Sequence, residues 1–242
     1  MLLTIIGILR EVSHMFTMIE LTVMMSFATM ILSLILATYL ISLWKDQETR
    51  LYTDLPLMLG VIFVTAVMSQ ALQLLGYLEI VEMTVEVFRF RSLIVLGMAL
   101  PMLGVMLHIW QPHRQKHHSK IVFALSAYWI VAEIISPTSD MIMTLTIPPL
   151  IFLMVGWLIT FSITWKTGRL KEVRSDLMVL GTLITMFGQI GRIPFTNIGL
   201  AFLPDTLNAL GMIFFTLALI NPWYKREVAP LEKATIEQDL YA

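Results

Sequence analysis

The 242-residue chain contains no cysteine. This absence excludes disulfide bonds, thiolate metal sites and cysteine nucleophiles together, because each of them requires the thiol group. It leaves the redox compartment of the protein open.

Charged residues are also scarce in this chain. They make up 14% of it, whereas 57% of the residues are hydrophobic and the mean hydropathy is +0.81. Such a composition excludes an ordinary soluble domain. The chain has no broad basic surface of the kind that binds nucleic acid, so we expect membrane lipids, and no nucleic acid, among its partners.

Seven long apolar segments fill most of the sequence. Each has about the twenty residues that a helix needs to cross a hydrocarbon core of about 30 Å. Short connections favour antiparallel packing of successive helices. We therefore predict an all-α fold, a polytopic membrane bundle of seven transmembrane helices. The predicted spans are 18–44, 51–78, 88–110, 120–136, 141–165, 176–203 and 206–224.

Basic residues alternate between the connections, and this alternation predicts an orientation. Twelve of the 16 lie after the first, third, fifth and seventh segments: Lys45, Arg50, Arg114, Lys116, Lys120, Lys166, Arg169, Lys171, Arg174, Lys225, Arg226 and Lys233. The positive-inside rule then places the N-terminus outside and the C-terminus in the cytoplasm. We expect a multi-pass protein of the cell membrane, with 1–17 as an outer interfacial segment or an outward extension of the first helix. The bundle would occupy 18–224, and 225–242 would form a cytoplasmic tail.

Several polar residues fall within the predicted spans, where they are costly unless they face the bundle interior or a wet cavity. At about 1.5 Å per residue, Glu133 and Arg192 lie roughly 20 and 24 Å from the cytoplasmic ends of their segments. An ion pair between them is therefore plausible. Two readings remain open: an outward-facing pocket that binds a small ligand or lipid, or a structural cluster that ties helices together. Both predict inward-facing side chains for Gln70, Gln73, Glu133, Gln189, Arg192, Asn197 and Asn208.

Two other groups of charged residues lie near segment ends. Arg89 and Arg91 could attract an anion to the mouth of the pocket, or snorkel to headgroups, or pair with Glu82 and Glu86. His113 and His117 have the i, i+4 spacing of a helical metal site. Three nearby cations and no carboxylate argue against a metal there, and we predict a solvated loop that contacts lipid phosphate or a partner.

Familiar catalytic and cofactor motifs are missing from the sequence. It has no nucleophile elbow, no glycine-rich phosphate loop and no paired transmembrane aspartates. Seven helices with the N-terminus outside resemble the microbial rhodopsins in topology, but the last segment lacks the lysine that binds retinal. We therefore expect no catalytic residue, no metal and no cofactor.

The run from Trp44 to Trp110 is similar to the seven-helix sensor region at the N-terminus of certain membrane histidine kinases. The likeness rests on Trp44 and Arg50 around the first cytoplasmic turn, an amide-bearing second helix, the Phe88-Arg89-Phe90-Arg91 start of the third, and Pro101. It covers about a third of the chain, and the kinase itself is missing. The resemblance implies a stand-alone sensor, or a subunit that acts on a separate protein.

We therefore predict a non-enzymatic seven-helix sensor or signalling module. A ligand in the outer pocket would move the fifth and sixth helices, which contain Pro148, Pro149 and Pro194, and a partner would read the basic 166–174 loop and the tail. One alternative is a small ion- or proton-coupled carrier or channel with Glu133 as its binding group. The other is a structural subunit of a membrane complex.

Overall fold

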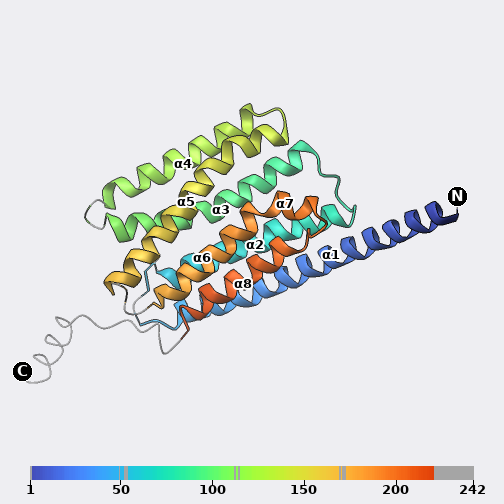
Figure 1. The fold of residues 1–242 in the computed structure, drawn as a ribbon. Helices are drawn as coiled ribbons and strands as arrows, with labels where there is room; N and C mark the ends of the chain where they lie inside the picture. The colour runs from blue at the N-terminus through green and yellow to red at the C-terminus, as the bar shows by residue number, and fades with distance from the viewer. Residues whose placement is uncertain are drawn as a thin grey trace, which may run out of the picture.

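The computed structural model describes residues 2–48, 50–51, 54–111, 113, 115–168, 170 and 173–220. Side chains are described from Glu20 onward, except those of Gln115 and Ile193. Within these residues the fold is all helical, without a strand, and the long helices run alternately in opposite directions (Figure 1). The predicted tail 225–242 and the last residues of the seventh segment lie outside the described residues.

Five helices are long and apolar enough to cross a membrane, and they correspond to the first five predicted segments. They are α1 (Leu2–Lys45), α2 (Leu55–Tyr77), α3 (Val85–Trp110), α4 (Gln115–Ile135) and α5 (Ser139–Thr167). The α1 helix is continuous through the region predicted to be interfacial, and its N-terminal part projects beyond the other helices (Figure 1).

Side-chain caps begin two of these helices. The Thr84 hydroxyl accepts a hydrogen bond from the Val87 amide at the start of α3, and Thr138 does the same for Met141 at the start of α5. Such caps satisfy amide groups that have no partner within the helix. They explain why both helices begin slightly before the predicted apolar segments.

The sixth predicted span, 176–203, is not one helix. It forms α6 (Ser175–Ile190) and the short α7 (Arg192–Asn197), which are separated at Gly191. Pro194 cannot donate a backbone hydrogen bond to the preceding turn, and Gly199 has a φ of 79°, which ends the helical path. The chain then reverses into α8 (Leu203–Leu217), which starts three residues before the predicted seventh span.

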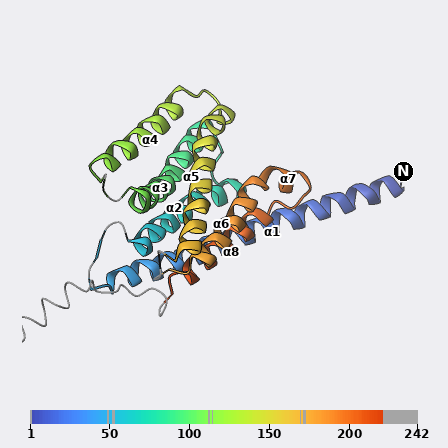
Figure 2. The ribbon, with the colours of Figure 1, turned by 60° about the vertical axis from the view of Figure 1, so that its left-hand side comes forward.

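The core lies where α1, α2, α5, α6 and α8 meet, and its fully buried side chains include Leu40, Phe63, Trp157, Phe161 and Met178. A second cluster surrounds Trp129 of α4, which packs against α3 and α5. Figure 2 shows α4 at the edge of the bundle. Its outward face is apolar, with Phe123 and Ile134 more than 70% exposed.

Glycines allow α6 and α8 to pack closely. A Cβ atom on Gly181 would lie 3.0 Å from the Gly211 carbonyl oxygen, and one on Gly211 would lie 3.0 Å from the Gly181 carbonyl oxygen and overlap the Thr185 hydroxyl. Small residues at such crossings let helix backbones approach one another. The two shorter apolar helices therefore form a tight hairpin, in which α8 packs against α1 and α6 packs against α5.

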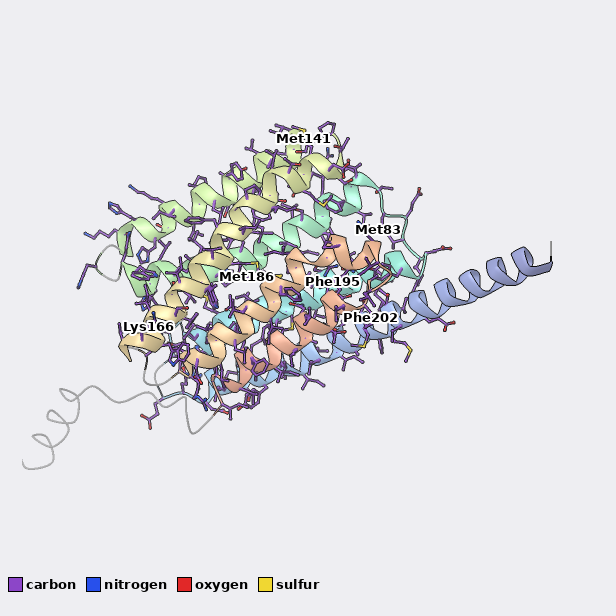
Figure 3. The ribbon with its side chains drawn as sticks, in the orientation of Figure 1. Met83, Met141, Lys166, Met186, Phe195 and Phe202 are labelled. Carbon is purple, nitrogen blue, oxygen red and sulfur yellow. The ribbon has the colours of Figure 1, made fainter. Side chains whose placement is uncertain are left out.

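The two ends of the bundle differ in character. Lys166 lies at one end, whereas Met83, Met141, Phe195 and Phe202 lie toward the other (Figure 3). The Lys166 end also holds the end of α1 at Lys45 and the end of α3 at Trp110 (Figure 1). We call it the basic end, and we call the opposite end, which carries α7, the α7 end.

Candidate functional site

Four of the seven predicted site residues have buried side chains. Gln70 and Gln73 of α2, Glu133 of α4 and Asn208 of α8 are each at most 8% exposed. Arg192 is partly buried, and it is the first residue of α7. Gln189 and Asn197 are exposed, so the prediction that they face inward is wrong. Gln189 lies just before the interruption at Gly191, and Asn197 is the last residue of α7, where the chain turns outward.

Arg192 does not pair with Glu133, contrary to the sequence-based prediction. Its Nη2 lies 3.1 Å from Oδ1 of Asp205, a residue of α8 that is 1% exposed. The other carboxylate oxygen of Asp205 accepts a 2.6 Å hydrogen bond from the Ser26 hydroxyl of α1. The Thr29 hydroxyl of α1 lies 3.3 Å from the Asp205 backbone carbonyl. Asp205 therefore joins α1, α7 and α8 at the α7 end.

The local sequence explains why Asp205 occupies this position. Pro204 is suited to the first turn of a helix, and a carboxylate in that turn is stabilised by the helix dipole. On α1, Thr22, Ser26, Thr29 and Ser33 are all buried and recur at intervals of three or four residues. That spacing places them on one face, which the sequence analysis overlooked. The same spacing, read from the sequence, would have indicated a partner for a polar group on another helix.

A second polar network joins α2 and α3 beside the first. Arg91 donates from Nη2 to Oε1 of Gln73 at 2.5 Å and from Nε to the Ser69 hydroxyl at 3.3 Å. Gln73 in turn donates to the Tyr77 hydroxyl at 2.7 Å. Arg91 therefore faces neighbouring helices and does not pair with Glu82 or Glu86. The sequence left Arg91 either at the pocket mouth or at the membrane interface, and its hydrogen bonds to Ser69 and Gln73 of α2 were not predicted.

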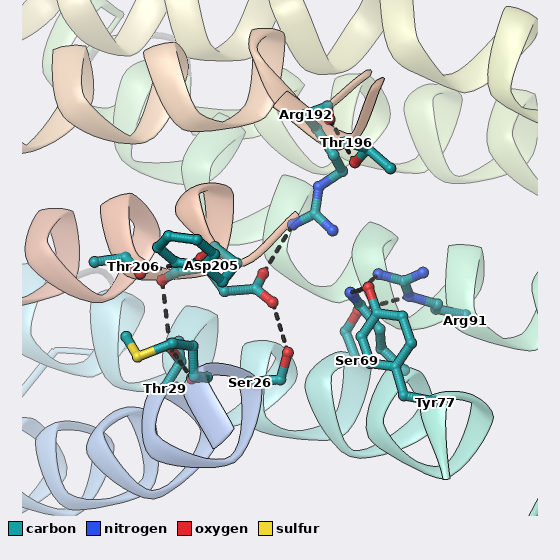
Figure 4. A network of polar contacts seen from close by, with 12 residues as sticks. Ser26, Thr29, Ser69, Tyr77, Arg91, Arg192, Thr196, Asp205 and Thr206 are labelled. Atoms are coloured by element: carbon teal, nitrogen blue, oxygen red, sulfur yellow. Dashed lines mark hydrogen bonds and ion pairs between the residues drawn. The ribbon is translucent and has the colours of Figure 1, made fainter. Parts of the chain in front are cut away.

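The two networks lie next to each other (Figure 4). The guanidinium group of Arg192 points from α7 toward Asp205, and Arg91 lies on the side of Ser69 and Tyr77. The ionisable groups that act electrostatically on Arg91 are Arg192, Tyr77 and Asp205. Asp205 is ion-paired with Arg192 and lies close enough to Arg91 to act on it only through space. We call the group of Ser26, Ser69, Gln73, Arg91, Arg192 and Asp205 the arginine site.

Glu133 lies apart from the arginine site. Its polar neighbours are Ser92, Arg89 and Trp129, yet neither carboxylate oxygen has a hydrogen-bond partner among the described residues. Arg89 instead pairs with Glu86 at 2.6 Å and donates to the Ser136 carbonyl at 2.7 Å. The pairing with Glu86 was one of the alternatives predicted from the sequence. The Trp129 indole donates to the Ser92 hydroxyl at 3.1 Å.

Polar contacts at the basic end join α5 to its neighbours α3 and α6, or link residues close in sequence. Trp110 donates to the Thr160 hydroxyl, and Thr164 donates to the Ser175 hydroxyl. Arg174 forms two hydrogen bonds with the Asp176 carboxylate, and these raise the pKa of the Arg174 guanidinium above its ordinary value. Across the described part of the chain, no group of three or more histidines, cysteines or carboxylates could hold a metal ion.

Comparisons with protein-family models, with curated proteins and with solved structures gave no match for this chain. The class defined by the fold is therefore an all-helical protein with five helices that could cross a membrane. Among the described residues, the arginine site at the α7 end brings together a buried carboxylate and two partly buried arginines, all of them hydrogen-bonded.

Proposed function

We propose that the chain is a seven-helix sensor module of the cell membrane, without enzymatic activity, that receives a small ligand or lipid at the α7 end. In this proposal the N-terminus and the α7 end lie outside, and the basic end lies in the cytoplasm. Lys45, Lys116, Lys120 and Lys166 at the basic end support this orientation by the positive-inside rule.

The sixth and seventh crossings depend on α6, α7 and α8. The α6 and α8 helices have 16 and 15 residues, which is short for a hydrocarbon core of about 30 Å. However, the helical path continues from Ser175 to Asn197 through α7, and at 1.5 Å per residue a straight path of that length would extend about 34 Å. The chain direction supports the same count, because α6 and α8 run antiparallel to each other across the bundle (Figure 1).

The observation that carries the proposal is the uneven distribution of buried polar groups. The arginine site consists of two neighbouring networks at the α7 end: charged hydrogen bonds of Arg91 join α2 with α3, and those of Asp205 join α1, α7 and α8. Toward the basic end the core holds fully buried apolar side chains such as Leu40, Phe161 and Met178, and its buried polar groups are mostly uncharged hydroxyls, among them Thr160, Thr164 and Ser175. A transport path needs polar groups that reach both faces, so this asymmetry favours a receiving site over a pore.

A specific observation favours one alternative, an ion- or proton-coupled carrier. The Glu133 carboxylate is buried without a hydrogen-bond partner among the described residues, as a proton-binding group in a membrane could be. Glu133 lies on α4 at the edge of the bundle, however, and its polar neighbours belong to α3 and α4. That placement does not connect it with the arginine site.

A flux measurement separates the two functions. The protein is reconstituted into liposomes that contain a pH-sensitive dye, and a pH or cation gradient is imposed. The sensor proposal predicts the same leak as in protein-free liposomes, for the wild type and for Glu133→Gln. Flux in the wild type that Glu133→Gln abolishes would establish the carrier and overturn the sensor proposal.

A further inference from the structure

Arg91 carries a positive charge that no carboxylate neutralises within the described part of the chain. The ion pairs found there are Arg89–Glu86, Arg174–Asp176 and Arg192–Asp205. Both acceptors of Arg91, the Ser69 hydroxyl and the Gln73 amide oxygen, are neutral. A guanidinium group cannot lose its charge as a lysine can, so burial leaves this charge in need of a counterion.

The carboxylate that acts electrostatically on Arg91 already has two partners. Asp205 receives Arg192 on one oxygen and the Ser26 hydroxyl on the other, so its two oxygens are both occupied by the first network. Arg192 and Asp205 balance each other, and Arg91 brings the net charge of the arginine site to about +1. One further negative charge would neutralise it.

The hydrogen-bonding capacity of the site also matches an acceptor-rich group. Arg192 Nε is buried and has no hydrogen-bond partner among the described residues. Buried donors of this kind are normally satisfied, and an arginine fork is suited to the paired oxygens of a carboxylate or phosphate. The Gln73 and Ser69 contacts hold Arg91 in place on the other side.

The depth of the site is suitable for a group near the membrane surface. Arg91 lies in the second turn of α3, which begins at Val85, so it is about 9 Å along the helix from its end. Arg192 begins α7, close to the turn that leads into α8. In the proposed orientation this position lies near the outer membrane surface, and the Arg192 side chain is 32% exposed there.

We propose that the arginine site binds a singly charged oxyanion, a phosphodiester or a carboxylate, between Arg91 and Arg192. This inference rests on the proposed sensor function and names the chemical class of its ligand. The two sources of such a group are the headgroup of an anionic lipid and a small soluble carboxylate. Binding would connect α3 with α7, and through Asp205 with α1 and α8.

The test uses the full chain purified in a non-ionic detergent. One arm titrates phosphatidylglycerol, with zwitterionic phosphatidylcholine, whose phosphodiester is already balanced by its choline cation, as the counterpart without net charge, and counts bound lipid by native mass spectrometry. The other arm titrates sodium benzoate and follows thermal stability, with sodium chloride at equal ionic strength as the reference. Saturable binding in the first arm identifies a lipid, and saturable binding in the second identifies a soluble carboxylate.

Arg89 provides the matched control, because it lies two residues from Arg91 on the same helix and has Glu86 as its own partner. We expect Arg91→Gln to weaken binding at least tenfold and Arg89→Gln to change it less than twofold. If Arg91→Gln does not fold, Arg91→Lys replaces it; that variant keeps the charge without the fork and should bind several-fold more weakly than Arg89→Lys. Absence of saturable binding in both arms, or equal losses for the two arginines, would overturn the inference.

These outcomes are independent of the flux measurement. Missing oxyanion binding with no flux would remove this ligand class and leave the sensor proposal in place. Oxyanion binding together with Glu133-dependent flux would support the site and overturn the sensor proposal.

Discussion

Arg192 of α7 and Asp205 of α8 form an ion pair, 3.1 Å between Nη2 and Oδ1, in which the two side chains differ greatly in exposure. The arginine side chain is 32% exposed, whereas the aspartate is 1% exposed. The chain reverses direction between them, and the pair holds the short α7 helix against α8. Because Ser26 also contacts Asp205, the same carboxylate fixes both helices to α1.

The difference in exposure predicts unequal effects of breaking the pair from either side. Arg192→Gln leaves a buried carboxylate without its cation, and we expect a loss of about 3 kcal/mol of stability. Asp205→Asn leaves a partly exposed arginine and keeps an acceptor for Ser26, so we expect about 1 kcal/mol. Thermal unfolding in detergent should therefore show a lower midpoint for Arg192→Gln. The double variant should unfold above Arg192→Gln, and the opposite order of the single variants would contradict this account.

Glu133 should be a destabilising residue. Its carboxylate oxygens are buried without hydrogen-bond partners among the described residues, and such groups cost about 1–3 kcal/mol. We expect Glu133→Leu to raise the unfolding midpoint, because leucine fills a similar volume without a polar group. Glu86→Gln is the control, since Glu86 is 76% exposed and its surface pair contributes little. A lower midpoint for Glu133→Leu would show that the carboxylate has a stabilising partner.

The close crossing of α6 and α8 should depend on Gly211. A methyl group there would meet Thr185 and the Gly181 carbonyl oxygen, so we expect Gly211→Ala to cost about 1–3 kcal/mol. Gly104→Ala in α3 is a matched helical control, because its nearest neighbour would be Met58 Cε at 3.9 Å. That variant should be neutral or slightly stabilising, since alanine favours the helix. Equal effects on the unfolding midpoint would argue against the tight hairpin.

The absence of cysteine makes the membrane orientation directly testable with single introduced thiols. In intact cells a membrane-impermeant maleimide should label Glu82→Cys and Asn197→Cys, both exposed at the α7 end. It should label Asp46→Cys, exposed at the basic end, only after permeabilisation. The unmodified protein is the blank. Labelling of Asn197→Cys only after permeabilisation, with Glu82→Cys labelled outside, would mean that α6 and α8 do not cross.

Apolar runs predicted the five long helices because a hydrophobic stretch of that length has few alternatives to a helix. Their ends shifted by a few residues where capping side chains such as Thr84 and Thr138 extend the helix into polar sequence. The sixth span was predicted as continuous because hydropathy does not register a single interrupting position. Gly191 and Pro194 are the residues that divide this span into α6 and α7, and Gly199 separates α7 from α8.

The arginine site was predicted only in part. Depth along each helix brought Gln73 and Arg192 to the correct end, but depth does not specify the direction in which a side chain points around the helix. Gln189 therefore turned out to be exposed, and Glu133 lies against α3 and away from Arg192. Asp205 was not among the predicted site residues, although Pro204 beside it marks the start of a helix.

The sequence by itself determined the helical class, the approximate helix positions and the separation of basic residues toward one end, because composition and charge act locally or through the membrane. Only the tertiary structure decided which polar groups meet. Pairing depends on helix rotation and on packing between segments far apart in the chain, as Ser26 and Asp205 illustrate. Close packing at Gly181 and Gly211 sets the position of α8 and therefore of the Asp205 carboxylate. That carboxylate pairs with Arg192 and not with Arg91.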